Sequence, residues 1–214
     1  MNWIPQSDAN SLAELPEVDL LQRMREGEEE AFLVLYRRLQ GGIYRFALRM
    51  SGSESMAEDV VQETFMILLQ GNGGFDAGRG SFRGYLYGIA RNQILRRFEK
   101  DRGVIPLAAE EEGPESGAIP DRLIAIDDPL GALTRQETVE SVRQAVLALP
   151  AHYREVVVLC DLHELSYQEA AEVLGCALGT VRSRLHRART LLLERLRGTD
   201  LEPTAEVGPL RCFV

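Results

Sequence analysis

The chain has 214 residues, a formal net charge of −9 and three cysteines spread along its length. That length allows one large domain or two small ones, and three scattered cysteines exclude a disulfide framework. The N-terminus lacks the basic flank and apolar core of a signal peptide, and the longest apolar run, residues 156–160, is too short to span a bilayer. We therefore expect a soluble protein of the cytoplasm.

Charge is strongly segregated along the chain. Residues 79–102 carry seven basic side chains against two acidic ones, and residues 178–197 carry six arginines against one glutamate. Residues 1–30 and 103–140 are acidic, with eight and nine acidic side chains respectively and two basic ones in each. Two basic islands between acidic tracts predict two nucleic-acid contacts, with acidic regions that discourage indiscriminate binding to DNA.

Apolar residues recur at helical spacing, and no convincing alternation of apolar and polar residues is present. The sequence therefore predicts an all-α fold. A first amphipathic helix is expected at residues 19–24, and a second carries a continuous apolar stripe. The stripe comprises Phe32, Leu35, Tyr36, Leu39, Ile43, Phe46 and Met50.

Two further helices are expected before residue 101. Ser55 and Glu58 have the spacing of a capping box, which predicts the start of the third helix. After a glycine-rich loop at residues 71–80, the fourth helix is expected over residues 82–100.

The segment that follows the fourth helix predicts a flexible acidic linker, because residues 103–130 contain four prolines and an acidic run. Its composition fits a solvated tether and a polyanion that lies in a basic channel built for RNA equally well. Helical spacing resumes near Thr134. The expected segments are a flexible N-terminus (1–17), a helical bundle (18–101), the acidic linker (102–135), a smaller helical domain (136–197) and a flexible tail (198–214).

Residues 165–196 have the pattern of a helix-turn-helix. Ser166 and Glu169 form a capping box that starts a short helix, and Gly175 permits the sharp reversal after it. Val181 and Leu185 begin the buried stripe of a second helix. The side chains expected to face outward are Arg182, Ser183, His186, Arg187 and Thr190. Such side chains can bind phosphates or base edges in a major groove, whereas a merely solvated helix face would mix its charges.

In this order, the motifs resemble those of the extracytoplasmic-function (ECF) sigma factors of bacterial RNA polymerase, over about residues 18–197. Ala57-Glu58-Asp59-Val60-Val61-Gln62-Glu63-Thr64-Phe65 is similar to a motif of sigma domain 2, and residues 82–92 are similar to its promoter-melting segment. Residues 148–154, 165–171 and 179–185 are similar to sigma domain 4.

This resemblance implies an initiation factor without catalytic activity, which binds core RNA polymerase, recognises the −10 and −35 promoter elements and promotes DNA melting. The implied partners are core RNA polymerase, promoter DNA in duplex and single-stranded non-template form, and an anti-sigma factor. Arg182, Ser183, His186 and Arg187 are the residues implied to contact the −35 element.

The resemblance also implies two groups of site residues in the first domain. Asp59 and Glu63 lie four apart and flank Gln62, an acidic patch that by itself is more typical of a solvated helix face. Within the surrounding motif, the resemblance implies that Asp59, Gln62 and Glu63 bind a basic helix of the polymerase. The residues implied to hold a flipped base of the −10 element are Gly71, Phe75, Arg83, Tyr87, Ile89 and Asn92.

Two alternatives predict other functions. A stand-alone helix-turn-helix regulator would need a dimerising or ligand-sensing domain at residues 18–101, where the sequence offers aromatic, arginine and acidic side chains instead. An enzyme would need partners for His152, His163 and His186, and no catalytic arrangement surrounds them. Cys160 and His163 lie three apart without a second ligand pair, so we expect no metal site and no cofactor.

Overall fold

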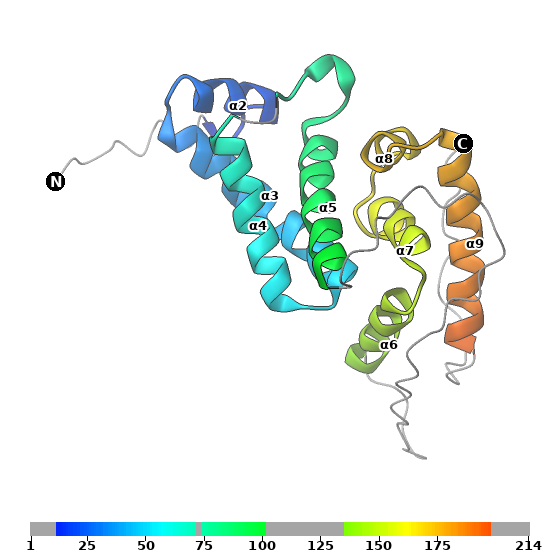
Figure 1. Cartoon of the computed structure of the whole chain (residues 1–214). Helices are drawn as coiled ribbons and strands as arrows, with labels where there is room; N and C mark the ends of the chain where they lie inside the picture. The colour runs from blue at the N-terminus through cyan, green and yellow to red at the C-terminus, as the bar shows by residue number, and fades with distance from the viewer. Residues whose placement is uncertain (1–11, 72–73, 102–134, 198–214) are drawn as a thin grey trace.

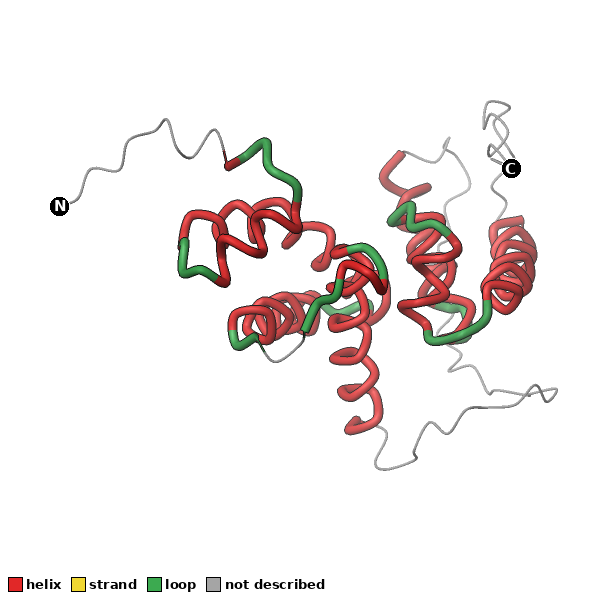
Figure 2. Tube along the Cα trace, turned by 90° about the horizontal axis from the view of Figure 1, so that it is seen from above, coloured by secondary structure: helices red, strands yellow, loops and turns green. Residues whose placement is uncertain are grey.

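The computed structural model describes residues 12–71, 74–101 and 135–197, and every regular element within them is helical (Figures 1 and 2). This confirms the predicted all-α fold. Residues 1–11 of the expected N-terminal segment, residues 102–134 of the expected acidic linker and the expected C-terminal tail lie outside the described residues. None of the described helices is both long and apolar enough to cross a membrane.

The helices form two units, and Figure 1 shows α5, the last helix of the first unit, between the other helices of that unit and the second unit. The N-terminal unit contains α2 (Glu17–Arg25), α3 (Glu29–Ser51), α4 (Glu54–Leu69), the 3-10 turn η1 (Ala77–Arg79) and α5 (Phe82–Asp101). The C-terminal unit contains α6 (Arg135–Leu147), α7 (Ala151–Val157), the π-helical turn η2 (Val158–Leu162), α8 (Tyr167–Leu174) and α9 (Leu178–Arg197).

Helix α3 is the centre of the N-terminal unit, because α2, α4 and α5 all pack against it. Most of the stripe predicted from its sequence is buried. The ring of Tyr36 also meets that of Phe65 on α4, with centroids 4.8 Å apart. Burial of such a stripe removes apolar surface from water, which is the main force that holds helices of this length together.

The predicted capping box of the third helix is wrong by two residues. Helix α3 ends at Gly52, whose φ of 71° lies in the left-handed region that favours glycine. Ser53 then has an extended backbone, and its hydroxyl accepts a hydrogen bond from the Met56 amide at 3.2 Å. Helix α4 therefore starts at Glu54, and Ser55 lies inside its first turn. The N-cap of α4 is Ser53 because α3 ends directly before it, at Gly52. The spacing of Ser55 and Glu58 alone did not show this.

The C-terminal unit is built on α7 and α9, which pack together with α8 beside them. Residues 155–159 are buried, and Leu185 and Ala188 of α9 pack into the same core. Leu192, further along the same face of α9, is only partly buried.

The two units contact each other along α3 and α5, which touch α6, α7, η2 and α8. Arg154 of α7 links the two units at one end of this contact. Its guanidinium donates to the Met50 carbonyl of α3 at 2.6 Å, to the carbonyl of Leu147 at the end of α6, and to that of Leu149 after it. One side chain thus satisfies carbonyls near the ends of two helices from different units.

Candidate nucleic-acid interface

The helix-turn-helix starts with the predicted capping box. The Ser166 hydroxyl accepts a hydrogen bond from the Glu169 amide at 3.2 Å, and the Glu169 carboxylate accepts one from the Ser166 amide at 2.9 Å. Partial burial alone would raise the pKa of Glu169, but hydrogen bonds from Ser81 and Ser166 hold it below its ordinary value. The carboxylate is therefore charged where it accepts from the backbone amide of Ser166, the N-cap residue of α8.

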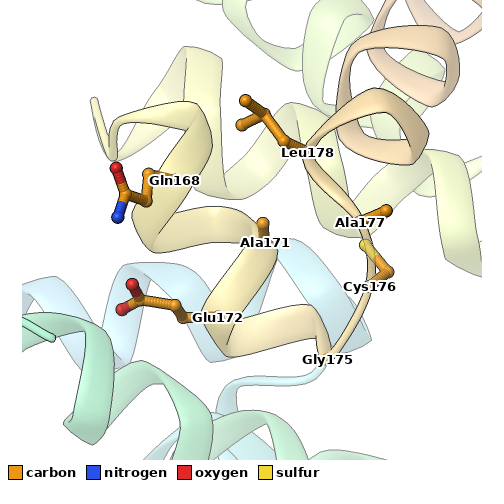
Figure 3. Close-up of a pocket in the computed structure, with 7 residues that line it drawn as sticks. All are labelled: Gln168, Ala171, Glu172, Gly175, Cys176, Ala177 and Leu178. Carbon is orange, nitrogen blue, oxygen red and sulfur yellow. The ribbon is translucent and has the colours of Figure 1, made fainter. Parts of the chain in front are cut away.

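The turn between α8 and α9 has a tight geometry that depends on one glycine. Gly175 has a φ of 64° and a ψ of 34°, so α8 ends in the left-handed conformation. A shallow hollow of about 450 Å³ lies beside the turn (Figure 3). It is lined by Gln168, Ala171, Glu172, Gly175, Cys176, Ala177 and Leu178. Small side chains such as Ala171 and Ala177 leave this space between the helices unfilled.

Helix α9 has one buried face and one exposed face. Val181, Leu185 and Ala188 are buried, whereas Arg182, Ser183, His186 and Arg187 are all exposed. Neither Arg182 nor Arg187 forms an ion pair with any residue that the structure describes. Arg189, by contrast, is bound by Asp161 of η2, with Nη2 and Oδ1 2.6 Å apart. The exposed face therefore offers guanidinium groups that can bind phosphates or guanine.

The acidic patch of α4 has a partner that the sequence did not reveal. Arg97 of α5 donates to the Asp59 carboxylate at 2.8 Å and to the Glu63 carboxylate at 2.6 Å. About half of each acidic side chain stays exposed, 56% for Asp59 and 46% for Glu63, and Gln62 beside them is exposed. The patch is thus accessible, but a single arginine partly neutralises it.

The six residues implied to hold a flipped base do not lie in one pocket. Phe75 packs against Phe82 and Tyr85, with ring centroids 5.3 and 5.6 Å away. Arg83 donates through Nε to Glu17 of α2 at 3.0 Å, and this hydrogen bond raises the pKa of Arg83. Gly71 and Asn92 are exposed, and Ile89 is partly buried.

Tyr87 points into the contact between the two units, where it lines one hollow together with Arg83 and His163. Its ring is 8% exposed and packs against Phe46, and its hydroxyl lies 2.8 Å from Nδ1 of His163. Tyr87 and Asn92 are five residues apart, so their directions differ by about 140° around α5. Burial raises the pKa of the Tyr87 hydroxyl.

Beside this contact, Arg91 of α5 forms a bidentate ion pair with Glu155 of α7. The two atom pairs are 2.7 and 3.2 Å apart, and the Glu155 side chain is only 5% exposed. We did not predict this pair from the sequence. A signal was present, since Glu155 directly precedes the apolar run 156–159 and a carboxylate at the edge of a core needs a cation.

His163 lies in the same contact and does not face a metal-binding cluster. Burial and the nearby Arg49 and Arg45 lower its pKa to about 4. Burial also raises the pKa of the Cys160 thiol to about 11. Among the described residues, no group of three or more His, Cys, Asp or Glu side chains is arranged to hold a metal ion.

Comparisons with known proteins agree with this arrangement of two helical units. The family Sigma-70 region 2 matches residues 35–103, and the family Sigma-70, region 4 matches residues 140–192. The chain is 33% identical over 178 residues to the ECF RNA polymerase sigma factor SigW of Bacillus subtilis (strain 168), which covers 83% of this chain and 95% of that protein. It is 36% identical over 166 residues to the ECF RNA polymerase sigma factor SigE of Mycolicibacterium smegmatis, covering 76% of this chain and 60% of that protein.

Solved structures show the same architecture. The sigma factor RpoE of Bartonella quintana, determined in complex with the anti-sigma factor NepR, superposes with a TM-score of 0.53 and 26% identity, covering 74% of this chain and 92% of that one. CnrH, determined with the cytosolic domain of CnrY, has a TM-score of 0.60 at 24% identity over 84% of this chain and 96% of that one, which is a likeness of fold. The chain belongs to the ECF group of the sigma-70 family of RNA polymerase sigma factors.

Proposed function

We propose that this protein binds core RNA polymerase, directs it to promoters with a −10 and a −35 element, and promotes DNA melting at the start of transcription. The observation that carries the proposal is the exposed face of α9, where Arg182 and Arg187 have no acidic partner among the described residues. We assign residues 18–101 to sigma domain 2 and residues 136–197 to sigma domain 4, and we place their action in the cytoplasm.

The α9 face would read the duplex −35 element. The first turns of a recognition helix reach base edges, and Arg182 lies in the first turns of α9. Ser183 donates to the Thr180 carbonyl at 3.1 Å, and its hydroxyl oxygen can still accept a hydrogen bond. Arg187 lies more than a turn further on, where a phosphate contact fixes register without reading sequence.

Asp59, Gln62 and Glu63 would bind core RNA polymerase. Both acidic side chains of the patch are more than two-fifths exposed. An accessible acidic surface of this kind is complementary to a basic helix of a partner. Such a partner would share or replace Arg97, which holds both carboxylates in the free protein.

Gly71, Phe75, Arg83, Tyr87, Ile89 and Asn92 would hold the −10 element. Unstacked bases are held by aromatic faces beside positive charge, and α5 and the preceding loop offer both. Tyr87 is turned toward His163, so its ring can reach a base only after the two units have moved apart. An anti-sigma factor is a further partner we propose, because the similar sigma factor RpoE of Bartonella quintana was solved in complex with the anti-sigma factor NepR.

Run-off transcription tests the proposal. Purified core polymerase would be mixed with the full chain and a library of genomic fragments, and transcripts would be mapped. We expect initiation at a small set of sites with a shared upstream sequence. Absence of initiation together with tight binding of the chain alone to duplex DNA would instead identify a stand-alone regulator.

A further inference from the structure

A small hollow of about 270 Å³ lies between α3, α5 and the residues that follow η2. Its lining is basic, since Arg38 and Arg45 of α3 and Arg83 of α5 all border it. Glu164 is the only carboxylate among the described residues that line it. Arg38 and Arg45 belong to none of the DNA or polymerase sites proposed above, so the purpose of this basic lining is open.

Two of the three guanidinium groups keep a charge that no carboxylate neutralises. Arg38 donates to the backbone carbonyls of Ala13 and Leu15, which accept hydrogen bonds but carry no net charge. Neither Arg38 nor Arg45 forms an ion pair with any residue in the described part of the chain. The third group, Arg83, pairs with Glu17 at 3.0 Å. The hollow therefore has an excess of positive charge.

Neighbouring groups respond to this excess charge. Burial and then the charge of Arg45 lower the pKa of Arg49, which lies one turn further along α3. Nη1 of Arg49 in turn lies 3.4 Å from Nε2 of His163, another residue of the lining. Cations that repel one another in this way are relieved by an anion placed between them.

The backbone around the hollow keeps it open on one side and shapes its edge on the other. Gly42 of α3 lines it, and a Cβ at that position would lie 3.1 Å from the Tyr87 hydroxyl. On the opposite side, Glu164 has a φ of 57° and is the one non-glycine residue with positive φ within the described ranges. Side chains with a Cβ rarely adopt this conformation, so the turn that carries Glu164 is held in place by its surroundings.

The size and chemistry of the hollow indicate which anion it fits. Pockets for drug-sized ligands have volumes of about 300–1,000 Å³, so a hollow of about 270 Å³ suits a smaller molecule. All three cations of the lining are arginines, whose planar fork matches the oxygens of a phosphate group. Three guanidinium groups around one space are complementary to an anion with two or more negative charges.

We propose that this hollow binds a small phosphate anion of the pyrophosphate class, held by Arg38, Arg45 and Arg83. The anion is either free pyrophosphate or the terminal phosphates of a nucleotide whose sugar and base stay outside the hollow. Neither α9 nor the acidic patch of α4 lines the hollow, so the site does not depend on the contacts proposed for the −35 element or for core polymerase.

Calorimetric titration of the full chain with sodium pyrophosphate, at low ionic strength and without divalent cations, tests the site. Arg45→Gln should weaken binding about tenfold, because it removes one charged donor. Arg37→Gln is the matched control, since Arg37 is an exposed arginine of the same helix that does not line the hollow. Glu164→Gln should strengthen binding, because it removes the carboxylate that competes with the anion. Absence of binding, or equal affinity of the wild type and all three variants, would overturn the proposal.

A second measurement locates the bound anion. The imidazole NMR signals of His163, identified by their loss in His163→Gln, should move when pyrophosphate is added, because His163 lines the hollow. Binding that leaves these signals unchanged would place the anion elsewhere and overturn the site.

Three further ligands separate the sources of the anion. Tighter binding of a nucleoside diphosphate than of pyrophosphate would identify a nucleotide, and weaker or equal binding would identify free pyrophosphate. Malonate, a dicarboxylate, should bind more weakly than either, and equal binding would contradict the phosphate class. If a single-stranded oligonucleotide binds in an Arg45-dependent way while pyrophosphate does not bind, these arginines contact a DNA backbone and the proposal is wrong.

Discussion

The two proposed DNA-contacting helices differ in what binds their arginines. On α9, Arg182 and Arg187 have no acidic partner among the described residues. On α5, Arg83, Arg91 and Arg97 each pair with acids from another helix, which are Glu17 on α2, Glu155 on α7 and Asp59 with Glu63 on α4. The α9 face is therefore ready for a ligand, whereas α5 must exchange internal partners for external ones. The density of basic residues along the sequence does not distinguish arginines that are free to bind a ligand from arginines that are already paired.

The largest expected effect concerns the acidic patch of α4. Changing Asp59 and Glu63 together to arginine should weaken binding to core polymerase by several kcal/mol, since a like-charge contact would replace an attractive one. Binding competition against wild-type protein measures this loss. Arg97→Gln is the control, because it removes the internal partner and leaves both acids in place. Unchanged affinity of a folded double variant would place the polymerase contact elsewhere.

A second prediction tests α5 as the melting helix. Replacing Tyr87 and Asn92 by alanine should slow open-complex formation about tenfold or more, because one base stack contributes roughly 1–3 kcal/mol. Duplex −35 binding should hardly change. Permanganate footprinting on intact and pre-melted templates measures the defect, and a pre-melted bubble should restore part of it.

Tyr87→Phe is the matched variant for this test. It keeps the ring packed against Phe46 but removes the hydroxyl that meets His163. Melting by this variant should equal or exceed that of the wild type. A defect as large as that of the alanine pair would mean that the hydroxyl, and not the aromatic face, is needed.

A third prediction separates two roles on the α9 face. Arg182→Ala should cost about 1–3 kcal/mol and relax the preference at one −35 position, as expected for a base contact. Arg187→Ala should weaken binding to all sequences alike and reduce the salt dependence by about one phosphate. A promoter library titrated at several salt concentrations distinguishes them. Identical behaviour of both variants on cognate and random DNA would indicate a purely electrostatic face.

The smallest effect concerns pH and the contact between the units. The pKa of His163 is lowered to about 4 where the two units are in contact. When the units separate, we expect the pKa of this side chain to return to an ordinary value near 6.5. Protonation of His163 therefore favours separation of the units. The contact between the units should have its full stability above pH 6.5. As the pH falls, the free energy that favours this contact should decrease, by about 1.4 kcal/mol at pH 5.5. Arg45 and Arg49 of α3, which face the ring, act in the same direction. Scattering from pH 7.5 to 5 measures the opening.

His163→Gln provides the reference for this titration. Because glutamine does not titrate, the variant should show a compactness that changes much less over the same range. Equal pH dependence of both proteins would assign the opening to other groups.

Several features were predictable because they depend on residues within a turn or two of one another. The capping box of α8 and the glycine that ends it are local, since each is completed by atoms of neighbouring residues. The helical period of the apolar stripe on α3 is local as well, and it predicted the all-α fold correctly.

The sequence by itself determined the presence of the helices, both ends of α8 and the outward face of α9. The reason is that backbone hydrogen bonding and apolar periodicity act over three or four residues. Tertiary structure decided the capture of Asp59 and Glu63 by Arg97 and the burial of Tyr87 against His163. Both depend on which helices cross and at what rotation, since they join residues 34 to 76 positions apart. A charge pattern shows which groups an element carries, and only packing decides which of them remain free.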